Sequence, residues 1–334
     1  MQYRPLGRSG LRVSPICLGT MMFGDRTEQA EAARIVDIAR DAGINFVDTA
    51  DVYTRGASER MLGPLIAKDR DSWVVATKVG NPMGKGANQG NHSRKWLMHE
   101  IDQSLGRLGT DHIDLWYLHV DDQKTPLAET LGAIADIIRA GKVRYWGVSN
   151  FTAWRLAEAC HVAREVGLPL PVASQPLYNA VNRQVEAEHL PACDFYGLGV
   201  VPYSPVARGV LTGKYGVDGT APEGSRAAIK DRRMMETEFR PESFAIAQQI
   251  VAHARSRNIS PTQFAILWLL RNKLVSSVIA GPRTVEQWQE YLGALEHALD
   301  DVDEKAVDAL VKPGHASTHG YTDPKYPVQG RVVG

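Results

Sequence analysis

Short apolar segments alternate with longer amphipathic segments along almost the whole chain. Eight of the short segments are nearly continuously apolar, which is typical of strands that are buried on both faces. The pattern therefore predicts eight strands, at residues 15–18, 44–47, 73–76, 113–118, 143–148, 172–174, 199–202 and 277–280.

The segments between these strands carry helix signals. Thr27 stands where an N-cap is expected, and Gly43, Gly141 and Gly167 follow three segments at the position where helices commonly end in the left-handed conformation. We expect helices at 27–42, 58–68, 93–106, 126–140, 154–166, 183–196 and 284–295, and two more at 241–256 and 260–271.

Buried strands joined by helices of this length form parallel βαβ units. Eight such units fit either a closed (β/α)8 barrel or an open doubly wound sheet. The open sheet usually has a GxGxxG turn after its first strand, whereas this chain reads GTMMFGD there. The sequence therefore favours an α/β fold of the (β/α)8 TIM barrel type, as one domain over residues 1–334, with long loops at the C-terminal face.

Three segments lie outside the eight units. The first fifteen residues predict a small hairpin that caps one end of the barrel. Residues 212–240 have no clean periodicity, so they are either a loop that folds over a ligand or a solvated, mobile loop. A tail that begins at Asp303 completes the chain.

The composition excludes several classes of function. Lysine plus arginine and aspartate plus glutamate both number 38 in 334 residues, so no charge excess favours nucleic acid or an anionic membrane. The three cysteines are scattered, and no apolar run is long enough to cross a bilayer. We expect a cytoplasmic protein without a metal site, since His315 and His319 lie in a glycine-flanked loop with no acidic third ligand.

Polar residues follow the predicted strands at the end where barrels place their active sites. Asp48, Lys78 and His119 each end a strand, and a period of two puts each on the same face as apolar residues expected to point inward. A lysine or an aspartate buried alone is costly, whereas the two together can pair. The pattern predicts that these side chains and Tyr53, in the loop after Asp48, lie together.

Such a group can deliver a proton. A phenol is a poor acid at neutral pH, but an adjacent ammonium lowers its pKa, and we expect Lys78 to do this to Tyr53. Asp48 would keep Lys78 charged, and His119 would orient a substrate oxygen.

With these residues the sequence resembles the aldo-keto reductases over nearly its whole length. The segments that carry the resemblance are NFVDTADVY, VVATK, IDLWYLH, GKVRYWGVSNF, PYSPVARGVLTGKY and VIAGPRTVEQWQEYLGAL, in that order. The resemblance implies a catalytic tetrad of Asp48, Tyr53, Lys78 and His119, with Tyr53 as the proton donor. It also implies hydride transfer from C4 of a reduced nicotinamide to the carbonyl carbon of an aldehyde or ketone.

The resemblance implies a cofactor site as well. Ser149, Asn150 and Gln175 would bind the carboxamide, Tyr203 would stack on the ring, and Arg283 would favour NADPH, with NADH a weaker possibility. Ala280 and Tyr291 depart from the family's usual proline and asparagine. The full set of implied contacts is Gly19, Thr20, Met21, Asp48, Ser149, Asn150, Gln175, Tyr203, Ser204, Pro205, Arg208, Gly281, Arg283 and Gln287.

Loops above the tetrad would form the substrate pocket, from Met22, Phe23 and Asn81 together with Tyr53 and His119. Methionine and aromatic side chains favour carbonyl compounds with a sizeable apolar part. Two alternatives stay open: a cofactor-binding regulatory protein similar to the potassium-channel β subunits, and a lyase that uses Lys78 as a Schiff-base amine. The sequence leaves the physiological substrate, the direction of reaction and the oligomeric state open.

Overall fold

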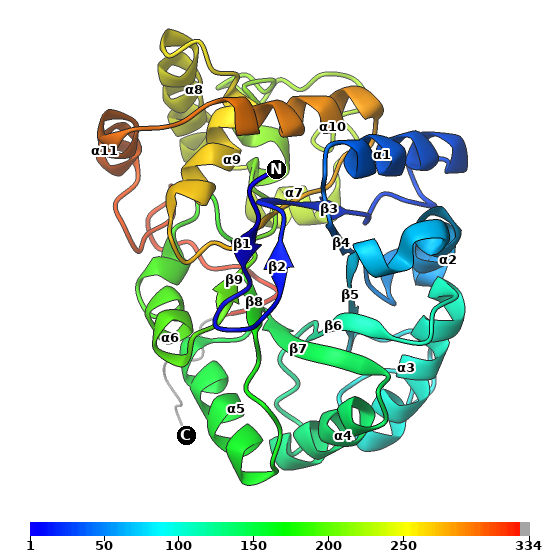
Figure 1. Cartoon of the computed structure of the whole chain (residues 1–334). Coiled ribbons are helices and arrows are strands. Elements are labelled where there is room, and N and C mark those ends of the chain that lie inside the picture. Colours follow the sequence, from blue (N-terminus) through cyan, green and yellow to red (C-terminus); the bar gives the residue numbers. More distant parts are fainter. Residues whose placement is uncertain (328–334) are drawn as a thin grey trace. The chain divides into compact units, whose positions relative to one another are not determined.

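The computed structural model describes residues 1–327, so the last residues of the C-terminal tail lie outside the described part of the chain. Eight parallel strands form one sheet in the order β10-β3-β4-β5-β6-β7-β8-β9 (Figure 1). They are β3 (Ile16–Gly19), β4 (Phe46–Asp48), β5 (Val74–Val79), β6 (Ile113–Leu118), β7 (Val143–Ser149), β8 (Ala173–Gln175), β9 (Gly199–Val200) and β10 (Val278–Ala280).

Backbone hydrogen bonds join the two ends of this sheet. The Val200 N–H donates to the Leu274 carbonyl at 2.9 Å, the Ser276 N–H donates to the Val200 carbonyl at 2.9 Å, and the Ile279 N–H donates to the Pro202 carbonyl at 3.0 Å. The sheet therefore closes on itself, and the fold is the predicted (β/α)8 barrel rather than an open sheet.

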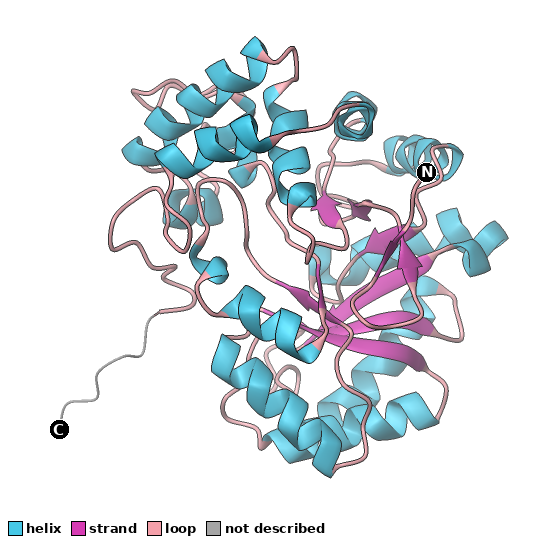
Figure 2. Cartoon of the chain, turned by 60° about the vertical axis from the view of Figure 1, so that its left-hand side comes forward, coloured by secondary structure: helices cyan, strands magenta, loops and turns pink. Residues whose placement is uncertain are grey.

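Helices connect the strands and lie outside them (Figure 2). Gly43, Gly141 and Gly167 have φ values of 76°, 74° and 67°, which confirms the predicted left-handed residues after three helices. The connecting helices are α1 (Gln29–Asp41), α2 (Ala57–Ile66), α3 (Arg94–Leu108), α4 (Leu127–Arg139), α5 (Ala153–Glu165), α6 (His189–Tyr196) and α10 (Val285–Leu292).

The chain divides into two compact units, and each is described by itself. The first unit holds the barrel and comprises residues 1–176, 188–203 and 273–292. The second comprises residues 177–187, 204–272 and 293–334, and its helices are α7 (Arg232–Thr237), α8 (Pro241–Ser256), α9 (Pro261–Arg271) and α11 (Asp301–Leu310). The organisation as one domain stays a prediction.

Several helix predictions need correction. Thr27 does not cap α1, because its hydroxyl donates to the Arg283 carbonyl at 3.0 Å and Glu28 is the N-cap. The helix predicted at 183–196 is broken: a short 3-10 turn, Gln184–Glu186, precedes α6, whose first turn holds Pro191, where a missing N–H costs nothing.

Two segments expected to be irregular contain helices. Residues 212–240 include α7, whose N-cap Asp231 accepts a hydrogen bond from the Met234 N–H at 2.9 Å. The expected tail from Asp303 begins inside α11, where Asp300 and Asp303 form a reciprocal capping box. Both helices are short, and local caps rather than a long apolar period define them.

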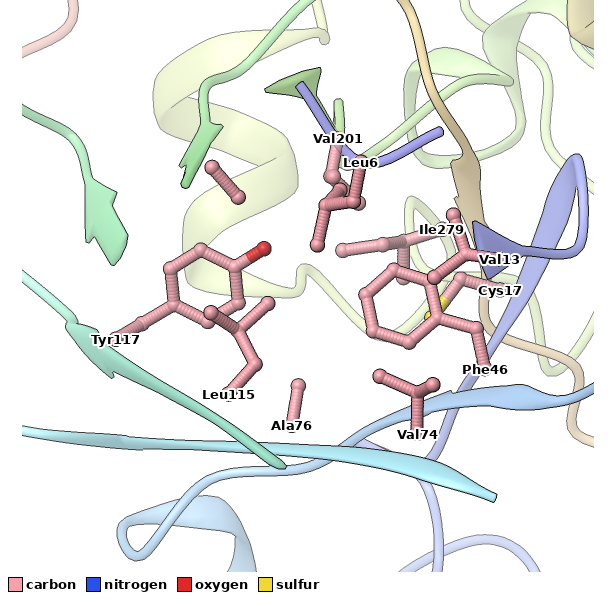
Figure 3. Close-up of a cluster of buried hydrophobic side chains, with 11 residues drawn as sticks. Leu6, Val13, Cys17, Phe46, Val74, Ala76, Leu115, Tyr117, Val201 and Ile279 are labelled. Atoms are coloured by element: carbon pink, nitrogen blue, oxygen red, sulfur yellow. The ribbon is translucent and has the colours of Figure 1, made fainter. Parts of the chain in front are cut away.

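The predicted N-terminal hairpin is present. Strands β1 (Arg4–Pro5) and β2 (Arg12–Val13) pair antiparallel, and the side chains of Leu6 and Val13 are fully buried. These two residues pack among the side chains of the barrel interior (Figure 3). The hairpin therefore closes one end of the barrel with apolar surface.

The barrel interior has an apolar layer that leads directly to the polar residues. Register pairs Phe46 with Val74 and pairs Ala76 with Leu115, so these inward faces lie level with one another. Asp48 and Lys78 lie one period further along the faces of Phe46 and Ala76, and His119 lies two periods beyond Leu115, just after the end of β6. The apolar cluster comprises Leu6, Val13, Cys17, Phe46, Val74, Ala76, Leu115, Tyr117, Ala173, Val201 and Ile279 (Figure 3).

Truncating this layer should destabilise the barrel. Leu115 is fully buried in the cluster, so Leu115→Ala should lower the free energy of unfolding by about 2–5 kcal/mol, measured by urea denaturation. Val302→Ala is the control, because Val302 is 61% exposed and its loss should change stability by less than about 0.5 kcal/mol. Equal effects of the two substitutions would contradict this description of the core.

Candidate active site

A buried ion pair occupies the centre of the candidate site. Lys78 at the end of β5 is fully buried, and its Nζ donates to Asp48 Oδ1 at 2.5 Å and to the Thr49 carbonyl at 2.7 Å. Burial lowers the pKa of Lys78, but the Asp48 carboxylate and Tyr53 together outweigh burial and raise that pKa above its ordinary value. The lysine is therefore held as an ammonium inside the barrel.

Tyr53 lies against this ammonium. Lys78 Nζ donates to Tyr53 Oη at 3.3 Å and lies 4.8 Å from the centroid of the ring. Burial raises the pKa of Tyr53, and Lys78 only partly opposes that rise, so the predicted net lowering is not what this structure gives. Because the phenol holds its proton at neutral pH, it can serve as a proton donor beside a fixed positive charge.

His119 completes the predicted group. Its ring meets the Tyr53 ring edge to face, with centroids 5.9 Å apart. Its backbone N–H donates to the Val79 carbonyl at 2.9 Å, and its own carbonyl accepts from Asn150 Nδ2 at 2.9 Å. The structure thus brings together all four residues of the predicted tetrad, from β4, β5 and the two loops beyond β4 and β6.

The residues predicted to bind a carboxamide form a network around this group. Gln175 Nε2 donates to Asp48 Oδ2 at 2.9 Å, and the Gln175 carbonyl accepts from Ser149 Oγ at 2.8 Å. Tyr203 Oη donates to Asn150 Oδ1 at 2.8 Å. Gln175 therefore has a role that the sequence did not predict, because it holds the second oxygen of Asp48.

Two buried hydroxyl groups near Asp48, those of Thr49 and Ser58, were not predicted, and Ser58 joins Thr49 to the predicted Thr20. Ser58 Oγ lies 2.8 Å from Thr20 Oγ1 and 2.9 Å from Thr49 Oγ1, and it also donates to the Thr20 carbonyl at 2.8 Å. Thr20 donates to the Asp48 carbonyl at 3.1 Å. The only sequence signal for these hydroxyl groups is that Thr49 directly follows Asp48. Ser58 lies on a helix, and nothing in the sequence pattern indicates where its side chain points.

The loop after β3 presents fewer side chains than the pocket prediction supposed. Phe23 is fully buried and Met22 is 7% exposed, whereas Met21 is 36% exposed. Phe23 thus supports the loop from within, and Met21 is the apolar side chain that the loop offers to solvent. Gly19 is required at its position, since an added Cβ would lie 2.8 Å from Ile279 Cγ2. Asn81, in the loop after β5, is half-buried.

The segment that leads into the first turn of α10 holds the residues predicted to bind the adenosine end of a cofactor. The Arg283 N–H donates to Gln287 Oε1 at 2.9 Å, and the Val285 N–H donates to Glu31 Oε1 at 2.7 Å. Side-chain oxygens thus satisfy amides that a phosphate could otherwise bind. Gly281, just before this turn, is exposed.

Ser204, Pro205 and Arg208 belong to the second unit. Ser204 and Arg208 have positive φ values of 58° and 52°. The Ser204 carbonyl accepts from Asn179 Nδ2 at 3.1 Å, and Arg208 Nε donates to Thr237 Oγ1 at 3.1 Å. These bonds fix the backbone of the segment within its own unit.

Membrane-spanning helices and clusters of metal-ligating side chains were both considered for the described residues. Every helix within residues 1–327 falls short of the length and apolarity that a membrane span requires. In the same part of the chain, no group of three or more histidine, cysteine, aspartate or glutamate residues is arranged to hold a metal ion.

A closed barrel with a buried lysine and aspartate at its strand ends, and a partly buried tyrosine in the loop after one of them, defines a recognisable class of protein, and comparison identifies it. A model of the Aldo/keto reductase family matches residues 15–312. The chain therefore belongs to the aldo-keto reductase family.

Curated relatives are similar over most of their length. A probable voltage-gated potassium channel subunit beta from Oryza sativa subsp. japonica is 38% identical over 302 residues, which cover 89% of this chain and 92% of that protein. Its counterpart from Arabidopsis thaliana is 36% identical over 304 residues, again covering 89% and 92%. The uncharacterized oxidoreductase YrpG from Bacillus subtilis (strain 168) is 36% identical over 333 residues, covering 96% and 99%.

Family membership supports a general class of activity. Aldo-keto reductases generally use a nicotinamide cofactor to reduce carbonyl compounds, and one relative is named as an oxidoreductase. The chain is accordingly an oxidoreductase of this general kind.

Breaking the buried pair should destabilise the protein in a pH-dependent way. Lys78→Met leaves Asp48 buried without its cation and should cost about 3–5 kcal/mol of unfolding free energy near neutral pH. Burial raises the pKa of Asp48 and Lys78 opposes that rise, so folded Lys78→Met keeps the Asp48 proton to higher pH than the folded wild type does, and the loss of unfolding free energy should shrink as the pH falls.

Urea denaturation at pH 5 and pH 8 measures this. The double variant Asp48→Asn with Lys78→Met removes both charges and should recover much of the loss. A Lys78→Met variant that is as stable as the wild type at both pH values would contradict a buried charged pair.

Proposed function

We propose that this protein is an NADPH-dependent reductase that converts an aldehyde or ketone to the alcohol, with Tyr53 as the general acid. One observation carries the proposal: the ion pair with Asp48 holds a charged Lys78 at 3.3 Å from Tyr53 Oη in a buried site. A fixed cation at this position stabilises the phenolate that forms when the tyrosine gives up its proton.

The bound nicotinamide would supply the hydride. As the carbonyl carbon gains that hydride, negative charge develops on the carbonyl oxygen, and Tyr53 donates its proton to this oxygen. Lys78 stabilises the resulting phenolate, Asp48 keeps Lys78 charged and aimed, and His119 orients the carbonyl oxygen by hydrogen bonding. The reverse sequence oxidises an alcohol through the same groups.

The side chains around the tetrad suit a dinucleotide. Ser149, Asn150 and Gln175 offer a hydroxyl and two amides that match the edge of a carboxamide, and Tyr203 offers a flat ring for stacking. Arg283 at the start of α10 favours a 2′-phosphate and hence NADPH. Glu31 accepts from an amide of the same turn and would repel that phosphate, so NADH should be tested in parallel.

A carbonyl substrate with an apolar part is the proposed class. The residues that would line its pocket are Met21 and Met22 from the loop after β3 and Asn81 from the loop after β5, beside Tyr53 and His119. Methionine side chains adapt to ligands of different shape, which suits a reductase that accepts several carbonyl compounds.

A second candidate is a cofactor-binding regulatory protein with little turnover. Two relatives are named as probable channel β subunits, and they match this chain about as well as the relative named as an oxidoreductase. A complete tetrad is compatible with either function. Binding of cofactor without turnover is the outcome that distinguishes this candidate.

A lyase that forms a Schiff base at Lys78 is disfavoured. A Schiff-base lysine must lose its charge to attack a carbonyl carbon. Here Asp48 and Tyr53 together hold the pKa of Lys78 above its ordinary value against the opposing effect of burial, so the amine is kept protonated.

NADPH consumption against a panel of aldehydes, dicarbonyls, sugars and bulky ketones tests the proposal, with NADH in parallel. Tyr53→Phe should lower kcat by roughly 10²- to 10⁴-fold, because it removes the donated proton, while the Kd for NADPH stays within a few-fold of the wild type.

The outcomes separate the candidates. Turnover that Tyr53→Phe abolishes supports the reductase, and the panel then ranks the substrates. NADPH binding without turnover by the wild type supports the regulatory candidate instead. Unimpaired turnover by Tyr53→Phe rejects tyrosine as the general acid.

A further inference from the structure

The turn that carries Tyr53 has an unusual backbone. Tyr53 begins a short 3-10 segment, Tyr53–Gly56, in which Thr54, Arg55 and Gly56 have φ values of 47°, 52° and 81°. Non-glycine residues rarely adopt positive φ, and two in succession persist only where the surroundings impose them. The surrounding contacts therefore decide where the phenol lies.

Asp51 holds the beginning of this turn. Its side chain is fully buried, and its Oδ1 accepts from the Val52 N–H at 2.6 Å. Its backbone N–H donates to the Lys78 carbonyl at 3.3 Å, which ties the turn to the strand that carries the catalytic ammonium. The other oxygen, Oδ2, is buried and accepts no hydrogen bond from the described residues.

A cluster of charged side chains holds the end of the turn. Arg107 Nε donates to Glu59 Oε2 at 2.6 Å, and Arg107 Nη2 donates to Glu100 Oε1 at 2.5 Å and to Ser104 Oγ at 3.0 Å. Glu59 also accepts from Thr77 Oγ1 at 2.6 Å. The cluster thus joins α2, α3 and β5.

Arg107 also contacts the turn itself. A Cβ added to Gly56 would lie 2.6 Å from Arg107 Cδ, so the arginine packs directly on the backbone of Gly56. Since Glu59 and Glu100 fix the guanidinium on either side, the cluster fixes the end of the turn as Asp51 fixes its start.

Three buried carboxyl groups lie near the guanidinium of Arg107: Glu59 and Glu100 form ion pairs with it, and Asp51 interacts with its charge. Burial, with the neighbouring Glu100 and Glu59, raises the pKa of Asp51 well above its ordinary value, and Arg107 only partly offsets this. Asp51 therefore holds its proton to higher pH than an exposed aspartate does. The Asp51 charge, once formed, raises the pKa of Tyr53, so the two groups are coupled.

We propose that Asp51 is a positioning residue for Tyr53: its carboxyl group holds the start of the turn while the Glu59–Arg107–Glu100 cluster holds its end. The proposal rests on the function proposed above, in which Tyr53 is the general acid. Its consequence is that the acid strength and the placement of the phenol depend on a carboxyl group that does not itself contact substrate or cofactor.

Two substitutions of Asp51 test this. Asp51→Asn keeps a neutral acceptor for the Val52 N–H, so kcat near neutral pH should stay within about 3-fold of the wild type. Asp51→Leu has similar bulk but no acceptor, so kcat should fall by on the order of 10- to 100-fold with the Kd for NADPH within about 2-fold. Asp102→Leu is the control, because Asp102 lies on α3 in an exposed pair with Lys142, and it should leave kcat unchanged.

The ionisation of Tyr53 is a second readout, which a purely structural role of Asp51 would not change. It is followed by ultraviolet absorbance, as the difference between each protein and the same protein carrying Tyr53→Phe. Asp51→Asn removes the charge that Asp51 gains on ionising, so Tyr53 should ionise at lower pH than in the wild type. The other charged groups that act on Asp51 or Tyr53 are Asp48 from β4, Lys78 from β5, Glu59 from α2, and Glu100 and Arg107 from α3.

Wild-type kcat in a folded Asp51→Leu variant, or an unchanged Tyr53 titration in Asp51→Asn, overturns the proposal. Failure of the proposed function is distinguishable: a wild type that reduces nothing in the panel rejects the reductase, while the Tyr53 titration still decides whether Asp51 acts on the phenol.

Discussion

A lysine ammonium buried in the barrel is the constraint on which the site depends. Lys78 retains its charge only because Asp48 Oδ1 lies 2.5 Å from Nζ and the Thr49 carbonyl accepts a second bond. Gln175 in turn donates to the other oxygen of Asp48, so the carboxylate is satisfied on both sides. The cation that would assist Tyr53 is thus held directly by Asp48 and Thr49, and through Asp48 by Gln175.

The barrel provides this pair with its surroundings. The apolar layer of Phe46, Ala76 and Leu115 lies inside the barrel (Figure 3). The next positions on the faces of Phe46 and Ala76 carry Asp48 and Lys78. An apolar layer of low dielectric constant beneath the pair strengthens the attraction between the two charges. It also raises the free-energy cost of burying either charge without its partner. The turn of Tyr53, with its positive φ values and its cluster of buried charges, then sets the phenol over the ammonium.

Much of this could be predicted from the sequence, because period two and apolar runs are local signals. They located the eight strands and placed Asp48 and Lys78 on the strand faces that carry the apolar layer, at the strand ends that the structure brings together with Tyr53 and His119. The net direction of the pKa of Tyr53 could not be predicted, since it depends on how deeply the ring is buried. Nor could the link from Gln175 to Asp48 or the packing of Arg107 on Gly56, since both join residues far apart in the chain.

Transfer of deuterium from NADPH labelled at C4 with deuterium on both faces tests the central claim most directly. The account predicts that mass spectrometry of the alcohol product will find one deuterium, bonded to the former carbonyl carbon, when the reaction is run in ordinary water. An alcohol product without deuterium, formed while the cofactor is consumed, would contradict direct hydride transfer to the carbonyl carbon.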